Sequence, residues 1–336
     1  MGNTYTSLST QDPQDVLLTN GQGVKSTVSM YLKKPPQKRR AVHVDTIGAL
    51  AAVRSGMLLS GSRDQSVILN NMDTGEAVQQ WTGHEKEVTK VVYRNVSGAH
   101  LLASGSRDES IRLWTFSSAT AVKELRGHSM SVTGLCASSD GQLFSGSRDT
   151  SIRKWDTQTG KQIRANDHTR NLVTHLAYSS ATRLLAQSSE DKSVKLWDAR
   201  DIVLVHEFPK KNNIQMHVDF AVEGTCVLSC SNGFNGDGCE ITLYDIRSPR
   251  KKLREFRGHE STVTSVCALN CPQALPRKLF MSTDTNGCVM LWNLEDGTCL
   301  WTYEGGCQHG GLHASLAFAD GSIVASGADG ALVQLS

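Results

Sequence analysis

The chain has 336 residues, of which 39% are hydrophobic and 20% are charged, and its formal net charge is +2. These values are typical of a globular protein and exclude a disordered chain. So small a net charge gives no electrostatic reason to expect nucleic-acid binding. No stretch approaches about 18 consecutive apolar residues, as a membrane-spanning helix requires, and the polar first twenty residues lack the apolar core of a secretory signal. We therefore expect a cytoplasmic protein of one large or two smaller domains.

Nine cysteines are spread along the chain without any CxxC pair. Most lie in apolar, strand-like segments, such as Cys136 in VTGLCAS and Cys267 in VTSVCAL. Buried, reduced thiols are the simplest interpretation, because structural disulfides are rare in the cytosol. The alternative is a redox-active pair formed by Cys230 and Cys239, which bracket the glycine-rich segment SNGFNGDG.

The N-terminal arm, residues 1–26, and the segment 27–42 together hold six basic and two acidic residues. The start, MGNTYT, fits the N-myristoylation pattern M-G-x-x-x-[ST], which makes Gly2 a candidate lipidation site. One myristoyl chain binds membranes weakly and needs a second signal. Attraction to an anionic membrane surface would come from Lys33, Lys34, Lys38, Arg39 and Arg40. Peripheral membrane contact is one hypothesis for this region, and a solvated basic linker is the other.

A repeat dominates residues 43–336. Segments 60–71, 104–115 and 145–156 read SGSRDQSVILNN, SGSRDESIRLWT and SGSRDTSIRKWD, and four weaker copies follow. The position of the tryptophan is taken in turn by Asn70, Trp114, Trp155, Trp197, Tyr244, Trp292 and Leu335. Successive spacings run from 41 to 48 residues, in or just beyond the length of one four-stranded propeller blade.

Each unit consists of short apolar or alternating runs separated by turn residues. In the second unit these runs predict strands at 88–93, 101–106, 110–114 and 121–125. Helical periodicity is not sustained over ten residues anywhere in the repeats. The sequence therefore predicts an all-β fold, a single seven-bladed propeller with four-stranded blades spanning 43–336.

A histidine precedes the tryptophan position in most units, as His43, His84, His128, His168, His259 and His309. Together with the SGSRD segments and the Trp-Asp endings, these histidines make the chain resemble the WD-repeat family. The resemblance implies hydrogen-bonded tetrads of histidine, serine, aspartate and tryptophan, complete in two sets: His84, Ser104, Asp108 and Trp114, and His128, Ser145, Asp149 and Trp155. We interpret these histidines as structural, because a pair repeated from blade to blade does not mark a unique active site.

Several units depart from this pattern. Asn70 replaces the tryptophan in the first unit and Gln187 the serine in the fourth. The fifth unit has Lys211 for histidine and Tyr244 for tryptophan, and the seventh has Leu335 for tryptophan. We expect the blades with these departures to be less rigid than the others.

The seventh unit ends after its third strand and would leave an unpaired edge. The resemblance implies that an N-terminal strand closes the ring from within 27–42. The segment TVSMYL, residues 27–32, has suitable β-branched and aromatic content, and residues 38–42 are the rival.

One position just before the turn aspartate is charged in four consecutive units, as Arg63, Arg107, Arg148 and Glu190. In a propeller this position lies on the face with the histidine loops, near the mouth of the channel. Because guanidinium groups pair bidentately with carboxylates, the three arginines form a candidate surface for acidic segments of partner proteins. The alternative is that they are exposed charges that keep the turns hydrated.

Two consecutive units end in the boxes Trp-Asp-Ala-Arg, residues 197–200, and Tyr-Asp-Ile-Arg, residues 244–247. Such boxes resemble those of propellers that present substrates to cullin-type ubiquitin ligases. The resemblance implies that Arg200 and Arg247 dock a ligase adaptor on the opposite face.

No P-loop, GxSxG or HExxH motif and no repeated metal-ligand spacing occurs in the sequence. We therefore predict a non-enzymatic protein-interaction scaffold without cofactor or metal, monomeric as a propeller but part of a complex. The segments 170–178, 206–215 and 229–245 resemble a cilium-linked member of the family, which implies a role in cilium-related trafficking.

Overall fold

The computed structural model describes the backbone of residues 15–19 and 25–29, and both backbone and side chains of residues 37–96, 98–166, 172–248, 252–269, 278–304, 311–318 and 321–335. In these residues it contains strands but no α-helix, and accordingly no helix long and apolar enough to cross a membrane. Strands β1 (Asp15–Thr19) and β2 (Lys25–Ser29) pair with each other as a separate antiparallel hairpin.

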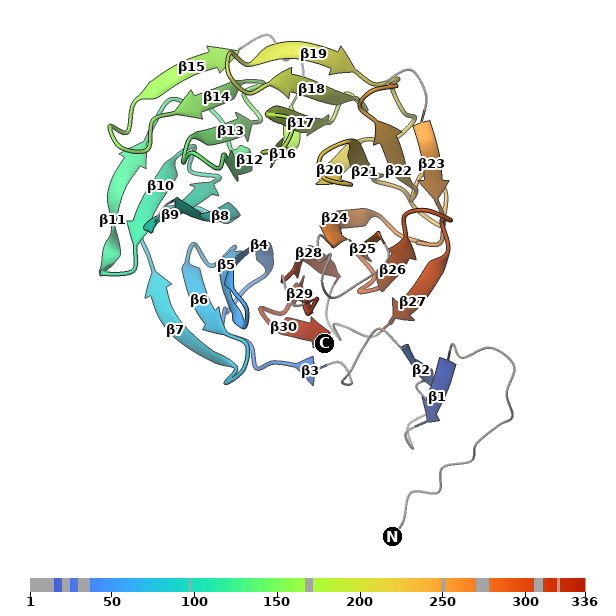
Figure 1. The fold of residues 1–336 in the computed structure, drawn as a ribbon. Helices are drawn as coiled ribbons and strands as arrows, with labels where there is room; N and C mark the ends of the chain where they lie inside the picture. Colours follow the sequence, from blue (N-terminus) through green and yellow to red (C-terminus); the bar gives the residue numbers. More distant parts are fainter. Residues whose placement is uncertain are drawn as a thin grey trace.

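Seven four-stranded antiparallel sheets surround a central channel as the blades of a propeller (Figure 1). The first three blades comprise β4 (Ile47–Arg54), β5 (Met57–Ser62), β6 (Val67–Asn71) and β7 (Glu76–Trp81); β8 (Val88–Val96), β9 (Ala99–Ser106), β10 (Ile111–Thr115) and β11 (Ser118–Leu125); and β12 (Val132–Ala137), β13 (Leu143–Ser147), β14 (Ile152–Trp155) and β15 (Gln162–Asn166). The next three comprise β16 (Val173–Ser179), β17 (Leu184–Ser189), β18 (Val194–Asp198) and β19 (Val203–Glu207); β20 (Gln215–Ala221), β21 (Cys226–Ser231), β22 (Ile241–Asp245) and β23 (Lys252–Phe256); and β24 (Val263–Leu269), β25 (Leu279–Asp284), β26 (Val289–Asn293) and β27 (Cys299–Tyr303). The first strand of each blade lies innermost, and the predicted seven-bladed all-β fold is confirmed.

The seventh blade is completed from the other end of the chain. Its strands β28 (Leu312–Ala317), β29 (Ile323–Gly327) and β30 (Leu332–Leu335) are joined by β3 (Gln37–Lys38), which pairs with β30 (Figure 1). The amide of Arg39 extends this pairing by donating to the carbonyl of Leu332. The prediction of an N-terminal closing strand is confirmed, but the segment 27–32 does not supply it: residues 27–29 belong to β2, and closure falls at the start of the rival segment.

Apolar side chains at each interface between neighbouring blades form the core. In the described residues, seven buried clusters each combine side chains from two adjacent sheets. The cluster between the first two blades, for example, contains Leu59 and Trp81 from one side and Val91 and Trp114 from the other. A sheet that buries both faces in this way needs apolar residues on both, which is why the middle strands read as nearly continuous apolar runs.

Hydrogen bonds from threonine side chains add to this packing at the inner rim. Thr174 and Thr264 donate their hydroxyls to the carbonyls of Gln215 and Leu312 in the next blade, at 2.6 and 2.7 Å. The equivalent hydroxyls of Thr89 and Thr133 bond to the next blade in the same way. Because these bonds cross between sheets, they fix the position of each inner strand relative to its neighbour.

Close approach between blades explains the glycine of the SGS segments. A Cβ atom added to Gly105 in β9 would lie 2.7 Å from Cγ1 of Val132 in the next blade. Gly105→Ala should therefore lower the free energy of unfolding by about 1–3 kcal/mol, the usual effect of overpacking a core. Chemical denaturation would measure the change.

Gly48→Ala is the matched control, because Gly48 also lies in a strand and its added Cβ would meet only the carbonyl oxygen of Val88, at 3.9 Å. The control should change stability by less than about 0.5 kcal/mol. Equal losses for the two variants would contradict the interpretation of close blade packing.

Candidate functional site

In the second and third blades, the predicted tetrads connect the tryptophan of the third strand to the aspartate in the turn between the second and third strands. In the second blade, Trp114 Nε1 donates to Ser104 Oγ at 2.8 Å, Ser104 Oγ lies 2.7 Å from His84 Nε2, and His84 Nδ1 lies 2.8 Å from the Asp108 carboxylate. Tryptophan can only donate and a carboxylate can only accept, so the chain of bonds runs from Trp114 to Asp108. Both predicted tetrads are confirmed, the second with His128, Ser145, Asp149 and Trp155 at 2.7 to 2.8 Å.

Two further tetrads were not assigned from the sequence. In the sixth blade, His259, Ser282, Asp284 and Trp292 repeat the geometry at 2.6 to 2.9 Å. In the first blade His43, Ser60 and Asp64 do so, and Asn70 Nδ2 donates to Ser60 Oγ at 2.9 Å. The side-chain amide of Asn70 thus supplies the donor that tryptophan provides elsewhere. In the sequence, both tetrads could have been recognised from His43 and His259, which precede the tryptophan position of their units as His84 and His128 do.

The fourth and fifth blades have other residues at some positions of the tetrad. Trp197 Nε1 donates to Gln187 Oε1 at 2.8 Å, so glutamine takes the place of serine, and Lys195 pairs with the turn aspartate Asp191 at 3.1 Å. In the fifth blade Lys211, which stands in place of histidine, pairs with Glu255 at 2.6 Å. His168 and His309 lie outside the described residues.

The tetrad aspartates hold the turns that carry the candidate arginines. Burial alone would raise the pKa of Asp108, but hydrogen bonds from His84 and Ser110 outweigh it and hold this pKa well below the usual range of a carboxyl. The pKa values of Asp64 and Asp149 are lowered in the same way. The ionised carboxylate is therefore part of the folded turn.

The structure places the four charged candidates at one equivalent position. The amides of Arg63, Arg107, Arg148 and Glu190 each donate to a carbonyl at the start of the blade's inner strand, at 2.9 to 3.1 Å. This backbone bond fixes all four on the face with the histidine loops, beside the channel, as predicted. We call the surface of Arg63, Arg107, Arg148 and Glu190 the arginine face.

The arginines of this face are not isolated charges. Arg63 and Arg107 both reach Glu87, at 3.7 and 3.2 Å, and Arg148 reaches Glu190 at 3.5 Å. Their side chains are still 45 to 52% exposed. Exposed ion pairs of this kind stabilise a protein by at most about 1 kcal/mol, so an incoming carboxylate can replace Glu87 or Glu190 at little cost.

Three exposed apolar side chains on the same face were not assigned from the sequence. Val44 follows His43, and Met130 lies two residues after His128. Phe234 lies in the GFNGDG turn, which is bonded to the loop of His259 through the amide of Gly236 and the carbonyl of Glu260 at 3.0 Å. Val44, Met130 and Phe234 are 94, 45 and 74% exposed. Exposed apolar side chains beside charged groups can add apolar contacts to a docking surface.

The arginines of the two boxes are exposed and held locally. Arg200 Nη2 lies 2.6 Å from Asp198, and Arg247 Nη2 lies 2.9 Å from Asp245. The two guanidinium groups are 71 and 72% exposed on two adjacent blades. Their carboxylate partners precede them by two residues, so each box forms a rigid local turn that presents its guanidinium group to solvent.

The alternative of a redox pair is not supported, because Cys230 and Cys239 are both free thiols. Burial raises the pKa of Cys230 to about 12 and also raises that of Cys239. A thiol needs its thiolate form to react, so neither is poised for exchange. The seven described cysteines are all free, which agrees with the interpretation as reduced thiols.

Comparison with known proteins agrees with this geometry. Residues 75–115, 119–156, 160–198 and 250–293 match the family WD domain, G-beta repeat. The third strands of the first, fifth and seventh blades, with Asn70, Tyr244 and Leu335, fall outside the match. These are the blades in which the tryptophan is replaced.

The chain is also similar to several longer proteins. It is 23% identical over 39% of its length to the transcriptional corepressor LEUNIG_HOMOLOG of Arabidopsis thaliana, covering 20% of that protein. It is 32% identical over 35% of its length to protein SPA1-RELATED 4 of the same plant, covering 14% of it. It is 30% identical over 40% of its length to nuclear distribution protein nudF 1 of Talaromyces marneffei, covering 28% of it. The chain thus spans less than a third of these three relatives.

The lowered pKa of Asp108 gives a pH-dependent prediction. A carboxyl whose pKa is lower in the folded than in the unfolded state stabilises the fold above its ordinary pKa, near 3.9, and this contribution is lost as the pH falls further. Asp108→Asn should cost about 1–3 kcal/mol near neutral pH, and the difference from wild type should narrow below about pH 4.

Urea unfolding at a series of pH values would measure this difference, with Asp73→Asn as a control for loss of an exposed carboxylate. A difference that stays constant from neutral to acidic pH would show that the Asp108 charge does not stabilise the turn.

Proposed function

The chain is a seven-bladed β-propeller that carries WD40 repeats, and we propose that it is a non-enzymatic scaffold that binds partner proteins on its arginine face. WD-repeat propellers generally bind other proteins. The observation that carries the proposal is the recurrence of Arg63, Arg107 and Arg148 at one backbone position on three consecutive blades. The tetrads below them keep the turns rigid, so little conformational entropy is lost when a partner docks.

The chemistry of the face indicates the kind of partner. Arginine forks select carboxylates, and the exposed side chains of Val44, Met130 and Phe234 can provide apolar contacts on the same face. We propose that the partner presents an acidic segment flanked by apolar side chains. The energetic anchors of such an interface are its arginines and its aromatic residue.

A second candidate function rests on Arg200 and Arg247, the arginines of the two Asp-x-Arg boxes. Arg200 and Arg247 are held by the aspartates of their own boxes, and their side chains are 71 and 72% exposed. Two fixed guanidinium groups on adjacent blades suit a docking protein with matching carboxylates. Under this alternative the chain is a substrate receptor of a cullin-type ubiquitin ligase.

We propose a localisation from the N-terminal arm and from a resemblance. We propose a cytoplasmic protein that contacts membranes through myristoylated Gly2 and the nearby basic residues; Gly2 lies outside the described residues. The segments 170–178, 206–215 and 229–245 resemble WD repeat-containing protein 31, which supports a role in cilium-related trafficking.

Charge reversal tests the two docking hypotheses against each other. The variant R63E/R107E/R148E should lose most of the partner proteins recovered with wild type, because it repels the acidic segment. The variant R200A/R247A should retain them. Quantitative affinity purification measures both, and equal melting temperatures show that both variants are folded. Loss of a cullin adaptor and its associated partners only in R200A/R247A would favour the ligase function and contradict the scaffold proposal.

Lipidation has a separate test. Gly2→Ala removes the acceptor amine of the glycine motif and should move the protein from the membrane fraction to the soluble fraction of cells. Metabolic labelling with a myristate analogue should mark the wild type and not the variant. An unchanged distribution together with an unlabelled wild type would refute the lipid anchor.

A further inference from the structure

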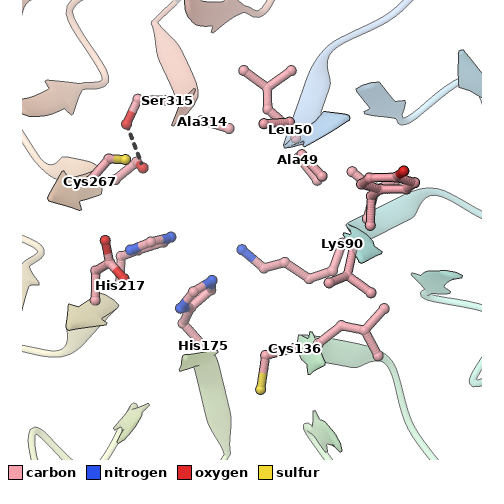
Figure 2. A pocket seen from close by; sticks show the side chains of 18 of the residues that line it. Ala49, Leu50, Lys90, Cys136, His175, His217, Cys267, Ala314 and Ser315 are labelled. Atoms are coloured by element: carbon pink, nitrogen blue, oxygen red, sulfur yellow. Dashed lines mark hydrogen bonds between the residues drawn. The ribbon is translucent and has the colours of Figure 1, made fainter. Parts of the chain in front are cut away.

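The central channel contains a cluster of nitrogen-bearing side chains that the docking hypotheses do not use. Lys90, His175 and His217 come from β8, β16 and β20 and point toward one another across the channel (Figure 2). Together with the inner strands of other blades they line a cavity of about 340 Å³. This cavity lies inside the ring and is separate from the arginine face.

The repeat itself brings these residues into one layer. Each innermost strand has a register shift after its first residue, and the third residue resumes the pairing. Lys90, His175 and His217 all occupy that third position. The other four blades have small residues there, namely Ala49, Gly134, Ser265 and Ala314. The small residues leave space, and the three long side chains fill only part of it.

The polar atoms of the cluster are incompletely bonded. Within the described part of the chain, the ammonium group of Lys90 has no hydrogen-bond or ion-pair partner, and Nδ1 of His217 is buried without one. His175 donates through Nδ1 to the carbonyl of Val218 at 3.1 Å, so its Nε2 is an acceptor in the neutral ring and becomes a donor only when the ring is protonated. The two imidazole rings stack with their centroids 3.6 Å apart. A buried polar nitrogen without a partner, such as Nδ1 of His217, costs free energy that a ligand can recover.

The electrostatics of the channel favour an anion. Burial lowers the pKa of Lys90 to about 8. Burial, then the neighbouring His217 and then Lys90 lower the pKa of His175, and burial and Lys90 lower that of His217. The remaining ionisable groups facing the cavity include Arg94, whose Nε donates to the carbonyl of Ala137, and His313, whose pKa is lowered by burial.

Asp219 is the one carboxylate among the described residues that line the cavity. Its two oxygens accept the amides of Phe220 and Ala268, at 2.8 and 3.0 Å, and burial raises its pKa to about 6. Among the described residues Asp219 forms no ion pair with Lys90, and the raised pKa lowers the negative charge that it adds to the cavity near pH 6.

We propose that the central channel binds a free tetrahedral oxyanion of the phosphate class, held by Lys90, His175 and His217. The ammonium group of Lys90 and the two imidazoles approach from three different blades. When protonated imidazoles join the ammonium group, the set of donors suits an acceptor with several oxygens better than a carboxylate, which has two. Bound anion would satisfy the ammonium group and favour the protonated imidazoles. It would also link the second, fourth and fifth blades across the channel.

Titration calorimetry with inorganic phosphate, at constant ionic strength maintained with chloride, tests the proposal on the full chain. Wild type should bind saturably, and Lys90→Met should weaken the Kd about tenfold to a hundredfold, as expected for loss of one charge-assisted hydrogen bond. Lys161→Met is the matched control, because Lys161 is exposed in the outer part of the third blade. The control should bind phosphate as wild type does.

Stability in phosphate-free buffer separates binding from folding. Lys90→Met removes a cation without a partner, so its melting temperature should equal or exceed that of wild type, and added phosphate should raise the melting temperature of wild type but not of the variant. Equal phosphate binding by all three proteins, or no saturable binding by wild type, would overturn the proposal. Tighter binding of acetate than of phosphate would overturn the assignment to the phosphate class.

Discussion

Apolar packing between neighbouring sheets is the constraint on which the rest of this molecule depends. A single four-stranded sheet with two apolar faces cannot shield both from water, and here each face is covered by the next sheet around the ring. The close contact at Gly105 and the threonine hydroxyls at the inner rim set the spacing and angle between sheets. Because every blade has two neighbours, no blade can be displaced without exposing two apolar surfaces.

The tetrads transmit this rigidity to the surface. A buried tryptophan or asparagine holds a serine, the serine holds a histidine, and the histidine holds the aspartate of the turn. The residue beside that aspartate is thereby presented at a fixed point near the channel. Blades thus carry different side chains at the same location, and the sequence of seven such residues around the ring determines what the face can bind.

Periodic features of this protein could be predicted from its sequence, and features without a pattern could not. The spacing of Trp114, Trp155 and Trp197 was enough for the blade number, and the histidines for the tetrads. The closing strand β3 is only two residues long, too short for a strand pattern, and the more strand-like segment 27–32 was therefore preferred. The ion pair between Arg63 and Glu87 joins two blades, so no local pattern reveals it. The cluster of Lys90, His175 and His217 in the channel can be recognised only when the third residues of all innermost strands are compared.

The position of β3 has a consequence for the synthesis of the chain. Gln37 and Lys38 leave the ribosome long before their partners Val333 and Gln334, because nearly the whole propeller lies between them in the sequence. The first blades can stack as they emerge, but the first and seventh can meet only after the strands of the seventh blade have been made. Until then Ile47 and Leu58, which pack against Phe318 and Leu332 in the completed ring, face solvent. A nascent chain of this kind therefore exposes an apolar blade face, to which chaperones can bind, until its seventh blade has been made.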